Sequence, residues 1–359
     1  MKRCTSCIMP YSVPGITFDE EGVCSLCRSY IPHTPLGEES LRQLLSSHGP
    51  GAKGYDSIVP LSGGRDSTYV LYLAKSELGL NPLAVNFDGE FRDSQAVVNM
   101  ENACRALGVD LLVVRSRHDV AAKIVKANIK TAINLGLPSL IMAMCRQCSY
   151  GYTSVAYREA ERNEAPFILW GTSSAESTER LQATMWENRL PSGWRRIRSI
   201  NFYRTEYYCL RQRLEFSVSG NPRLSRRDPR LRNPRIHEIK VFDYLPWDRR
   251  RIKDTIIGEL GWVKPPSRIS TWRTDCLLHE LVNFLFVKSV GCTKDCLGYC
   301  NMVNAGQMSR DEALQQEEAA LSAIRWERMA FLLEHYVGLS PRDIERINVM
   351  QSQSPYPER

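Results

Sequence analysis

Short apolar segments alternate with amphipathic ones through most of the chain. Each apolar segment has the length of a buried strand, and the segments between them repeat their apolar residues with helical periodicity. Buried strands separated by helices are typical of a parallel sheet covered on both faces. The pattern therefore predicts an α/β fold built on a doubly wound parallel sheet. The expected strands cover residues 57–61, 82–87, 110–114, 167–170 and 239–245.

The pattern changes on both sides of this alternation. Residues 31–54 are rich in glycine and proline around one short helical pattern, which indicates a linker. We expect the sheet domain to span residues 55–260, with Gly261 ending its last helix. Residues 261–359 form a mainly helical region by pattern. Its expected helices cover residues 277–287, 310–335 and 341–349.

Composition limits the partners and the cellular location to be expected. The chain has 359 residues, 43% of them apolar, and a formal net charge of +7. This modest positive charge fits anionic partners such as nucleotides, nucleotide sugars or RNA. No run approaches the roughly 20 apolar residues of a membrane span, and the start lacks the apolar region of a signal peptide. We therefore expect a cytoplasmic protein without a membrane partner.

The string Ser62-Gly-Gly-Arg-Asp-Ser67 follows the first expected strand and precedes an amphipathic helix. Free backbone N–H groups and the helix dipole make such a turn an anion site. Gly63 and Gly64 allow the backbone to approach a phosphate closely. The spacing differs from that of a Walker A loop. An ordinary strand-to-helix turn is the alternative interpretation.

Two later strand ends carry residues suited to a ligand. Asp88 lies just after the strand expected over residues 82–87, and Gly171 opens a small polar loop after residues 167–170. Ligands of parallel sheets bind outside the carboxyl ends of the strands. We therefore expect Asp88 and Gly171 to face the same ligand as the loop at Ser62.

Paired cysteines mark residues 1–30 as a metal-binding segment. Four thiolates at this spacing satisfy tetrahedral zinc, and so short a segment needs the metal in order to fold. Iron–sulfur ligation or free thiols are the alternatives. The expected zinc ligands are Cys4, Cys7, Cys24 and Cys27.

The other cysteine groups are ambiguous from spacing. Cys145 and Cys148 form a lone C-x-x-C, which fits half a metal site, a redox pair or two packed thiols. A distant group with four-residue spacing follows Cys276, and it fits either a metal or cluster site that includes Cys276 or packed thiols. That group consists of Cys292, Cys296 and Cys300.

Residues 186–236 interleave arginines with aromatic and proline residues. Such a composition can hold phosphate and stack on rings, as in binders of nucleotides or nucleic acids. A solvated insertion whose charge only aids solubility is the alternative. The sequence places this basic insertion within the sheet domain.

The Ser62–Ser67 string resembles the loop of the PP-loop ATP pyrophosphatases, which have a HUP-like sheet and cleave ATP between the α and β phosphates. Most members carry lysine where this chain has Arg65. Together with the paired cysteines, residues 14–27 and residues 168–171, the loop resembles the N-acetyl sugar amidotransferases over about residues 1–175. Those enzymes act in the biosynthesis of bacterial surface polysaccharides.

This resemblance implies a cofactor set and a mechanism. ATP with Mg²⁺ would lie on the loop, with Asp66 placing metal or phosphate and Arg65 stabilising the leaving charge. The enzyme would adenylate the acetamido carbonyl of a sugar or nucleotide sugar. Ammonia from a separate glutaminase subunit would then displace AMP. The residues expected to hold pyrophosphate are Ser62, Gly63, Gly64 and Ser67.

A second resemblance implies the same activation by adenylation but a different nucleophile, sulfide in place of ammonia. PP-loop enzymes that thiolate tRNA share the paired N-terminal cysteines, the loop and a C-x-x-C with a distant third cysteine. The corresponding residues here are Cys145, Cys148 and Cys276, which would hold a [4Fe–4S] cluster that binds sulfide. A nucleotide sensor that binds ATP without turnover is a third, non-enzymatic interpretation.

Overall fold

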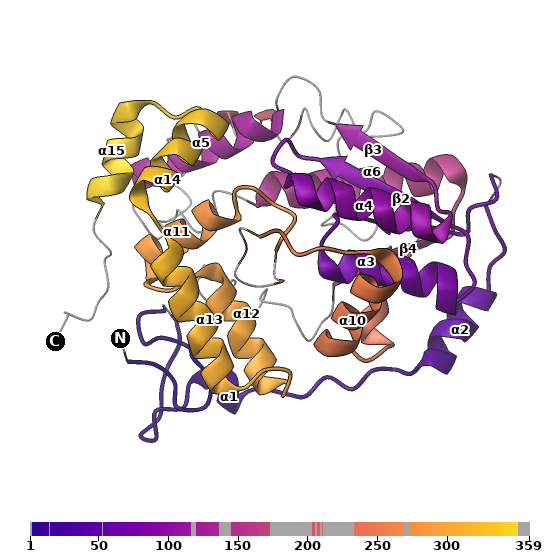
Figure 1. Ribbon diagram of the computed structural model, residues 1–359, viewed down its shortest axis with the longest axis horizontal. Helices are drawn as coiled ribbons and strands as arrows, with labels where there is room; N and C mark the ends of the chain where they lie inside the picture. Colours follow the sequence, from indigo (N-terminus) through magenta and orange to yellow (C-terminus); the bar gives the residue numbers. More distant parts are fainter. Residues whose placement is uncertain are drawn as a thin grey trace.

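The structure is a computed structural model whose centre is a sheet of five parallel strands in the order β3-β2-β1-β4-β5 (Figure 1). The strands are β1 (Ser57–Pro60), β2 (Pro82–Asp88), β3 (Leu111–Arg115), β4 (Phe167–Trp170) and β5 (His237–Lys240). This arrangement confirms the predicted doubly wound parallel sheet. The described residues are 2–13, 15–51, 53–115, 120–135, 145–172, 203–204, 207–208, 210, 233–266, 268, 271 and 273–350.

Strand β1 is the central strand of the sheet. Ser57 pairs with Pro82 of β2 on one side and with Phe167 of β4 on the other. From β1 the chain builds outward through β2 to β3, and it then returns to the other side of β1 to form β4. The switch in direction between β1 and β4 opens the crevice where sheets of this kind bind ligands.

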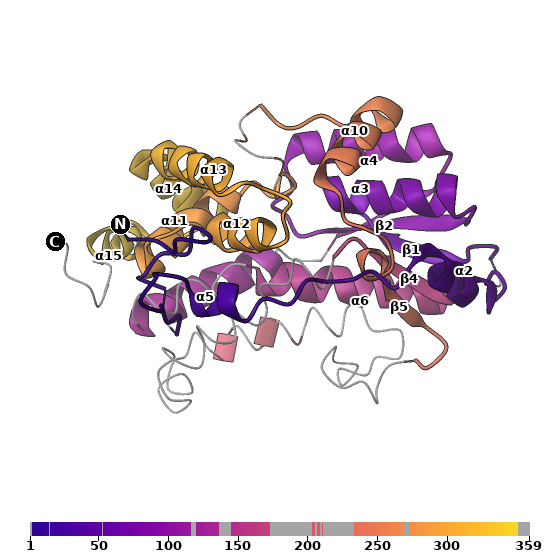
Figure 2. The ribbon, with the colours of Figure 1, turned by 90° about the horizontal axis from the view of Figure 1, so that it is seen from below.

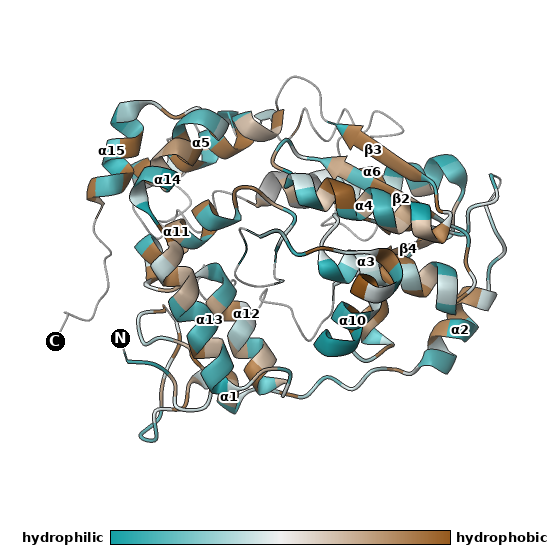
Figure 3. Ribbon diagram, viewed as in Figure 1, coloured by the Kyte–Doolittle hydropathy of each residue, from teal (hydrophilic) through white to brown (hydrophobic). Residues whose placement is uncertain are grey.

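Helices cover both faces of the sheet, as Figure 2 shows from below. On one face lie α3 (Arg65–Tyr72), α4 (Ser94–Leu107) and α10 (Arg249–Leu260), which pack on one another. On the other face α6 (Arg146–Asn163) packs across β1, β2 and β4. Figure 3 shows β3 as a mostly hydrophobic ribbon beside helices of mixed hydropathy. Burial on both faces explains the continuous apolar sequence of β1, β2 and β4. The edge strands β3 and β5 are partly exposed, and β5 alternates polar residues with Ile239.

A second core joins the two ends of the described chain. The buried cysteines of the N-terminal segment share it with helices far along the sequence. The N-terminal segment therefore packs on the C-terminal helices, and Figure 1 shows it beside them. The C-terminal helices are α11 (His279–Val290), α12 (Lys294–Asn304), α13 (Arg310–Ala323), α14 (Trp326–Phe331) and α15 (Pro341–Val349). Helix α5 (Val120–Leu135), from the middle of the chain, contributes to the same core.

The remaining elements are short. Helix α1 (Ser25–Arg28) follows the second cysteine pair, and α2 (Glu38–Ser46) is the helix expected within residues 31–54. Two π-helical turns, Leu73–Glu77 and Leu332–Tyr336, extend α3 and α14.

Several element boundaries differ from the sequence prediction, and two of the differences are large. The last strand stops at Lys240, because a 3-10 turn over Val241–Asp243 takes the chain out of the sheet. The long helix expected over residues 310–335 is two helices, since Ile324 and Arg325 adopt extended backbone angles. Gly291 ends α11 in a left-handed conformation, and Gly298 lies within α12. Helix α3 also begins at Arg65, within the string expected to precede it.

Candidate active site and metal centres

The predicted phosphate loop lies at the switch between β1 and β4. It leaves β1, and α3 begins at Arg65. Gly171 follows β4 directly, and a Cβ atom on it would lie 3.0 Å from the backbone of Asp66 and Ser67. The structure therefore brings Gly171 against the first turn of α3.

Hydrogen bonds between its own residues hold the loop in shape. The Ser62 amide donates to Ser67 Oγ over 3.2 Å, and the Gly64 amide donates to Ser62 Oγ over 3.3 Å. Gly63 has a left-handed φ of 79°, and its carbonyl accepts from Trp262 Nε1 at 3.0 Å. No side chain caps the N-terminus of α3, which leaves that helix end suited to a phosphate.

Arg65 and Asp66 form an ion pair within the loop. Arg65 Nε and Nη2 each donate to one oxygen of the Asp66 carboxylate over 3.0 Å. The Arg65 guanidinium is buried and lies 5.0 Å from the centre of the Trp247 ring, and Trp247 Nε1 donates to Asp66 over 3.1 Å. Bidentate pairing and stacking both depend on a planar guanidinium, which lysine lacks. Arg65 thus has a structural role that a lysine would not fill.

Asp88 ends β2 as predicted, and its carboxylate is buried among donors. Arg92 Nη2 lies 2.9 Å and Arg115 Nε 2.8 Å from Asp88 Oδ2, while the Glu90 amide donates to Oδ1 over 2.9 Å. Two guanidinium groups thus share one carboxylate at this strand end, with Glu90 close by in the chain. Asp88 therefore positions two cations at the ligand-binding edge of the sheet.

The structure brings Cys145, Cys148 and Cys276 into one neighbourhood. Cys145 directly precedes α6, and Cys148 lies in the first turn of that helix. A Cβ atom on Gly89 would lie 3.2 Å from Cys148 Sγ, and the backbone of Cys276 forms an antiparallel bridge with Arg92. The segment after β2 therefore lies against Cys148 and also pairs with the segment before α11, which carries Cys276. This places the third cysteine near the C-x-x-C pair.

Electrostatics distinguish the three thiols. Burial and then the neighbouring Cys276 and Cys145 raise the pKa of Cys148 well above its ordinary value. Burial and then Asp275 raise the pKa of Cys276 to about 12. Desolvation acts the same way on Cys145, but Lys294 and Arg273 outweigh it and lower the pKa of that thiol. Cys145 is the most exposed of the three.

Asp275 links this neighbourhood to the phosphate loop, and the sequence analysis missed it. A Cβ atom on Gly64 would lie 3.7–3.8 Å from the Asp275 carboxyl group. The Asp275 carbonyl also accepts from the Asp93 amide over 3.1 Å. Its position next to Cys276 in the chain is the signal that could have identified it. Asp275 supplies a carboxylate, the ligand type that Mg²⁺ prefers, beside the loop.

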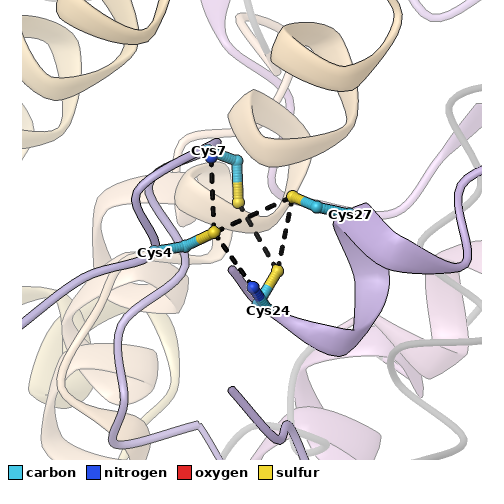
Figure 4. A group of neighbouring side chains, drawn as sticks. All are labelled: Cys4, Cys7, Cys24 and Cys27. Atoms are coloured by element: carbon cyan, nitrogen blue, oxygen red, sulfur yellow. Dashed lines mark hydrogen bonds between the residues drawn. The ribbon is translucent and has the colours of Figure 1, made fainter. Parts of the chain in front are cut away.

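The four N-terminal cysteines lie together in a cluster that could hold a metal ion. Their four sulfur atoms all lie within 4.8 Å of one another and point toward a common centre (Figure 4). The amides of Cys7 and Cys24 donate to Cys4 Sγ, and Arg310 Nε donates to the Cys7 carbonyl over 2.9 Å. Neighbouring thiols, Cys24 first, lower the pKa of Cys27. Four sulfurs this close fit a tetrahedral ion and leave no open position for catalysis.

The cysteines of the 292–300 group belong to the core beside this metal site. Cys292, Cys296 and Cys300 are buried, and Arg3 Nη1 lies 3.5 Å from Cys296 Sγ. Cys276 lies instead with Cys145 and Cys148. The structure thus separates the two sets that the sequence analysis considered as one candidate site, and it favours packed thiols for the 292–300 group.

Comparisons with known proteins add little to this geometry. No family model matches the chain. The uncharacterized protein MJ1599 of Methanocaldococcus jannaschii is 27% identical over 117 residues, which cover 31% of this chain and 42% of that protein. The U34-tRNA thiolase NcsA from Methanococcus maripaludis, solved with its [4Fe-4S] cluster, covers 100% of this chain and 92% of its own at 13% identity, with a TM-score of 0.36. At that score the likeness shows neither fold nor function.

The structure bears only in part on two further expectations, which concern a membrane span and the basic insertion. None of the helices within the described ranges is long and apolar enough to cross a membrane. The basic insertion expected over residues 186–236 lies almost wholly outside the described residues.

Proposed function

We propose that this chain is a PP-loop enzyme that uses ATP to adenylate a carbonyl oxygen and then replaces that oxygen with sulfur. The observation that carries the proposal is the gathering of Cys145, Cys148 and Cys276 beside the loop, with Asp275 reaching toward Gly64. An ATP site next to three convergent thiols fits activation followed by sulfur transfer better than activation alone.

The chain's own residues account for the activation. The uncapped end of α3 and the amides of the loop would hold the phosphates, with Ser62 and Ser67 beside them. Asp275 and Asp66 are the carboxylates available to Mg²⁺. Because both oxygens of Asp66 accept from Arg65, this pair would have to open before Asp66 could bind metal.

The reaction balances without an external oxidant or reductant. The acceptor's carbonyl oxygen attacks the α-phosphorus of ATP, and pyrophosphate leaves with the electrons of the broken P–O bond. Hydrosulfide then attacks the carbonyl carbon, the C–O bond breaks, and AMP leaves with the oxygen. The product is a thiocarbonyl. Adenylation is needed because an amide oxygen is a poor leaving group.

Three cysteine ligands fit a [4Fe–4S] cluster with one open iron, which would supply a binding position for sulfide. Cys145, Cys148 and Cys276 would hold it, and the positive groups near Cys145 suit an anionic cluster. The acceptor is an anionic molecule by this account, either tRNA or a small molecule with an amide. Arg92 and Arg115 at the strand ends are suited to its phosphate groups.

Amide activation followed by ammonia attack is the second candidate function. The observation that favours it is the resemblance of residues 4–27, 62–67 and 168–171 to the N-acetyl sugar amidotransferases. Under this candidate the acceptor is an N-acetyl sugar or nucleotide sugar, and a separate glutaminase subunit supplies ammonia. The three cysteines would then have a structural role or hold a single metal ion.

One assay separates the two functions. The protein is incubated with ATP and Mg²⁺, with either bulk tRNA or a panel of nucleotide sugars, and with either sulfide or ammonium. AMP formation is measured and products are identified by mass spectrometry. We expect AMP with a thiolated product, and loss of that product in Cys276→Ser but not in Cys104→Ser, whose thiol is buried in a different core. An amidine product that persists in Cys276→Ser would refute the sulfur-transfer proposal.

A further inference from the structure

Lys294 lies where helix electrostatics disfavour it. It is the first residue of α12, and Thr293 caps that helix by accepting from the Cys296 amide over 3.1 Å. A cation at a helix N-terminus is disfavoured, because it opposes the macrodipole. Stabilisation of α12 therefore does not explain the lysine. Its ammonium group instead lies 3.3 Å from Cys145 Sγ.

The backbone beneath Lys294 is fixed by buried hydrogen bonds. The Lys294 amide donates to Asn283 Oδ1 over 3.1 Å. The next residue, Asp295, is buried, and its Oδ2 lies 2.8 Å from His279 Nε2 and 2.9 Å from Asn283 Nδ2. Two residues of α11 thus anchor the first turn of α12, and the lysine side chain extends from a rigid base toward Cys145.

A second cation acts on the same cysteine. Arg273 interacts electrostatically with Cys145 and with Asp275. Two cations and the positive end of a helix therefore surround one sulfur of the three-cysteine site. A neutral thiol that is only packed in a core would gain nothing from two neighbouring cations.

We infer that Lys294 is a positioning residue for the three-cysteine site, where its hydrogen bond holds the Cys145 sulfur and raises the reduction potential of a cluster bound there. The inference rests on the proposed function. Hydrogen bonds and positive charge at ligand sulfurs stabilise the more negative, reduced form of an iron–sulfur cluster. Outer residues that orient a ligand in this way commonly tune a metal site.

The test is a redox titration of the full chain after anaerobic reconstitution with ferrous iron and sulfide. Lys294→Met removes the donor and the charge at similar length, and Lys294→Arg restores both. Lys288→Met is the matched control, because Lys288 lies on the neighbouring α11 and donates to the Asn348 carbonyl. Iron content and the midpoint potential, followed by electron paramagnetic resonance, are measured for each protein.

We expect Lys294→Met to have a lower midpoint potential than wild type, with Lys294→Arg and Lys288→Met close to wild type. If Lys294→Met assembles no cluster, Lys294→Gln is compared with Lys294→Arg, and the glutamine variant should have the lower potential. Equal potentials in all variants that hold iron would overturn this inference alone. A wild-type protein that binds no iron would overturn both the inference and the proposed function.

Discussion

Substitution of Gly63 by alanine tests the geometry of the phosphate loop. Gly63 has a φ of 79°, and an alanine Cβ there would lie 2.1 Å from the carbonyl oxygen of Ala96. The left-handed backbone costs an L-residue roughly 1–2 kcal/mol. The contact is with the backbone of α4, so a helix rather than a side chain must shift, and overpacking of that kind costs about 1–3 kcal/mol.

We therefore expect Gly63→Ala to lose about 2–5 kcal/mol in apparent free energy of unfolding. Gly64→Ala is the matched control, because its φ of −75° is ordinary and the nearest atom to its Cβ is the movable Ser62 Oγ at 3.2 Å. The control should stay within about 1 kcal/mol of wild type. Urea unfolding followed by circular dichroism measures both. Equal stability of the two variants would refute the described loop geometry.

Three further predictions address other sites. Trp247→Phe keeps a ring near Arg65 but removes the hydrogen bond to Asp66, so we expect a loss of about 1 kcal/mol in the same unfolding assay. Burial, and then Cys296, raise the pKa of Glu317 to about 7, so the folded state holds a proton that the unfolded state lacks between about pH 4.3 and 7. Stability should therefore fall as pH rises through that window, by up to about 4 kcal/mol, and Glu317→Gln should flatten this slope. Cys7→Ser should lose about one zinc per chain and expose the N-terminal segment to limited proteolysis, and retained zinc in this variant would contradict the assigned site.

Local patterns were enough to predict most of the fold. The apolar strands, the helix that follows β1 and the cluster of four N-terminal cysteines follow from periodicity and spacing, which are properties of neighbouring residues. The largest errors of extent, at residues 241–245 and near Ile324, occur where no glycine or proline marks the break. Gly291 shows the contrast, because it ends α11 as a glycine signal predicts.

The parts of the site that the sequence did not predict depend on contacts between distant residues. The approach of Lys294 to Cys145 joins positions 149 residues apart. Arg65 and Asp66 are neighbours in the sequence. Their ion pair is nevertheless supported by a hydrogen bond to Asp66 from Trp247, which is 181 residues away. No local pattern encodes such contacts, because they arise only when the helices pack.

The function claimed for the three cysteines can be tested by metal analysis of protein purified and reconstituted without oxygen. The account predicts a brown protein with about four irons per chain, beside one zinc at the N-terminal site. Cys276→Ser should lose the iron and its absorption while keeping the zinc, and Cys104→Ser should keep both. A colourless wild-type protein with zinc alone would contradict the account.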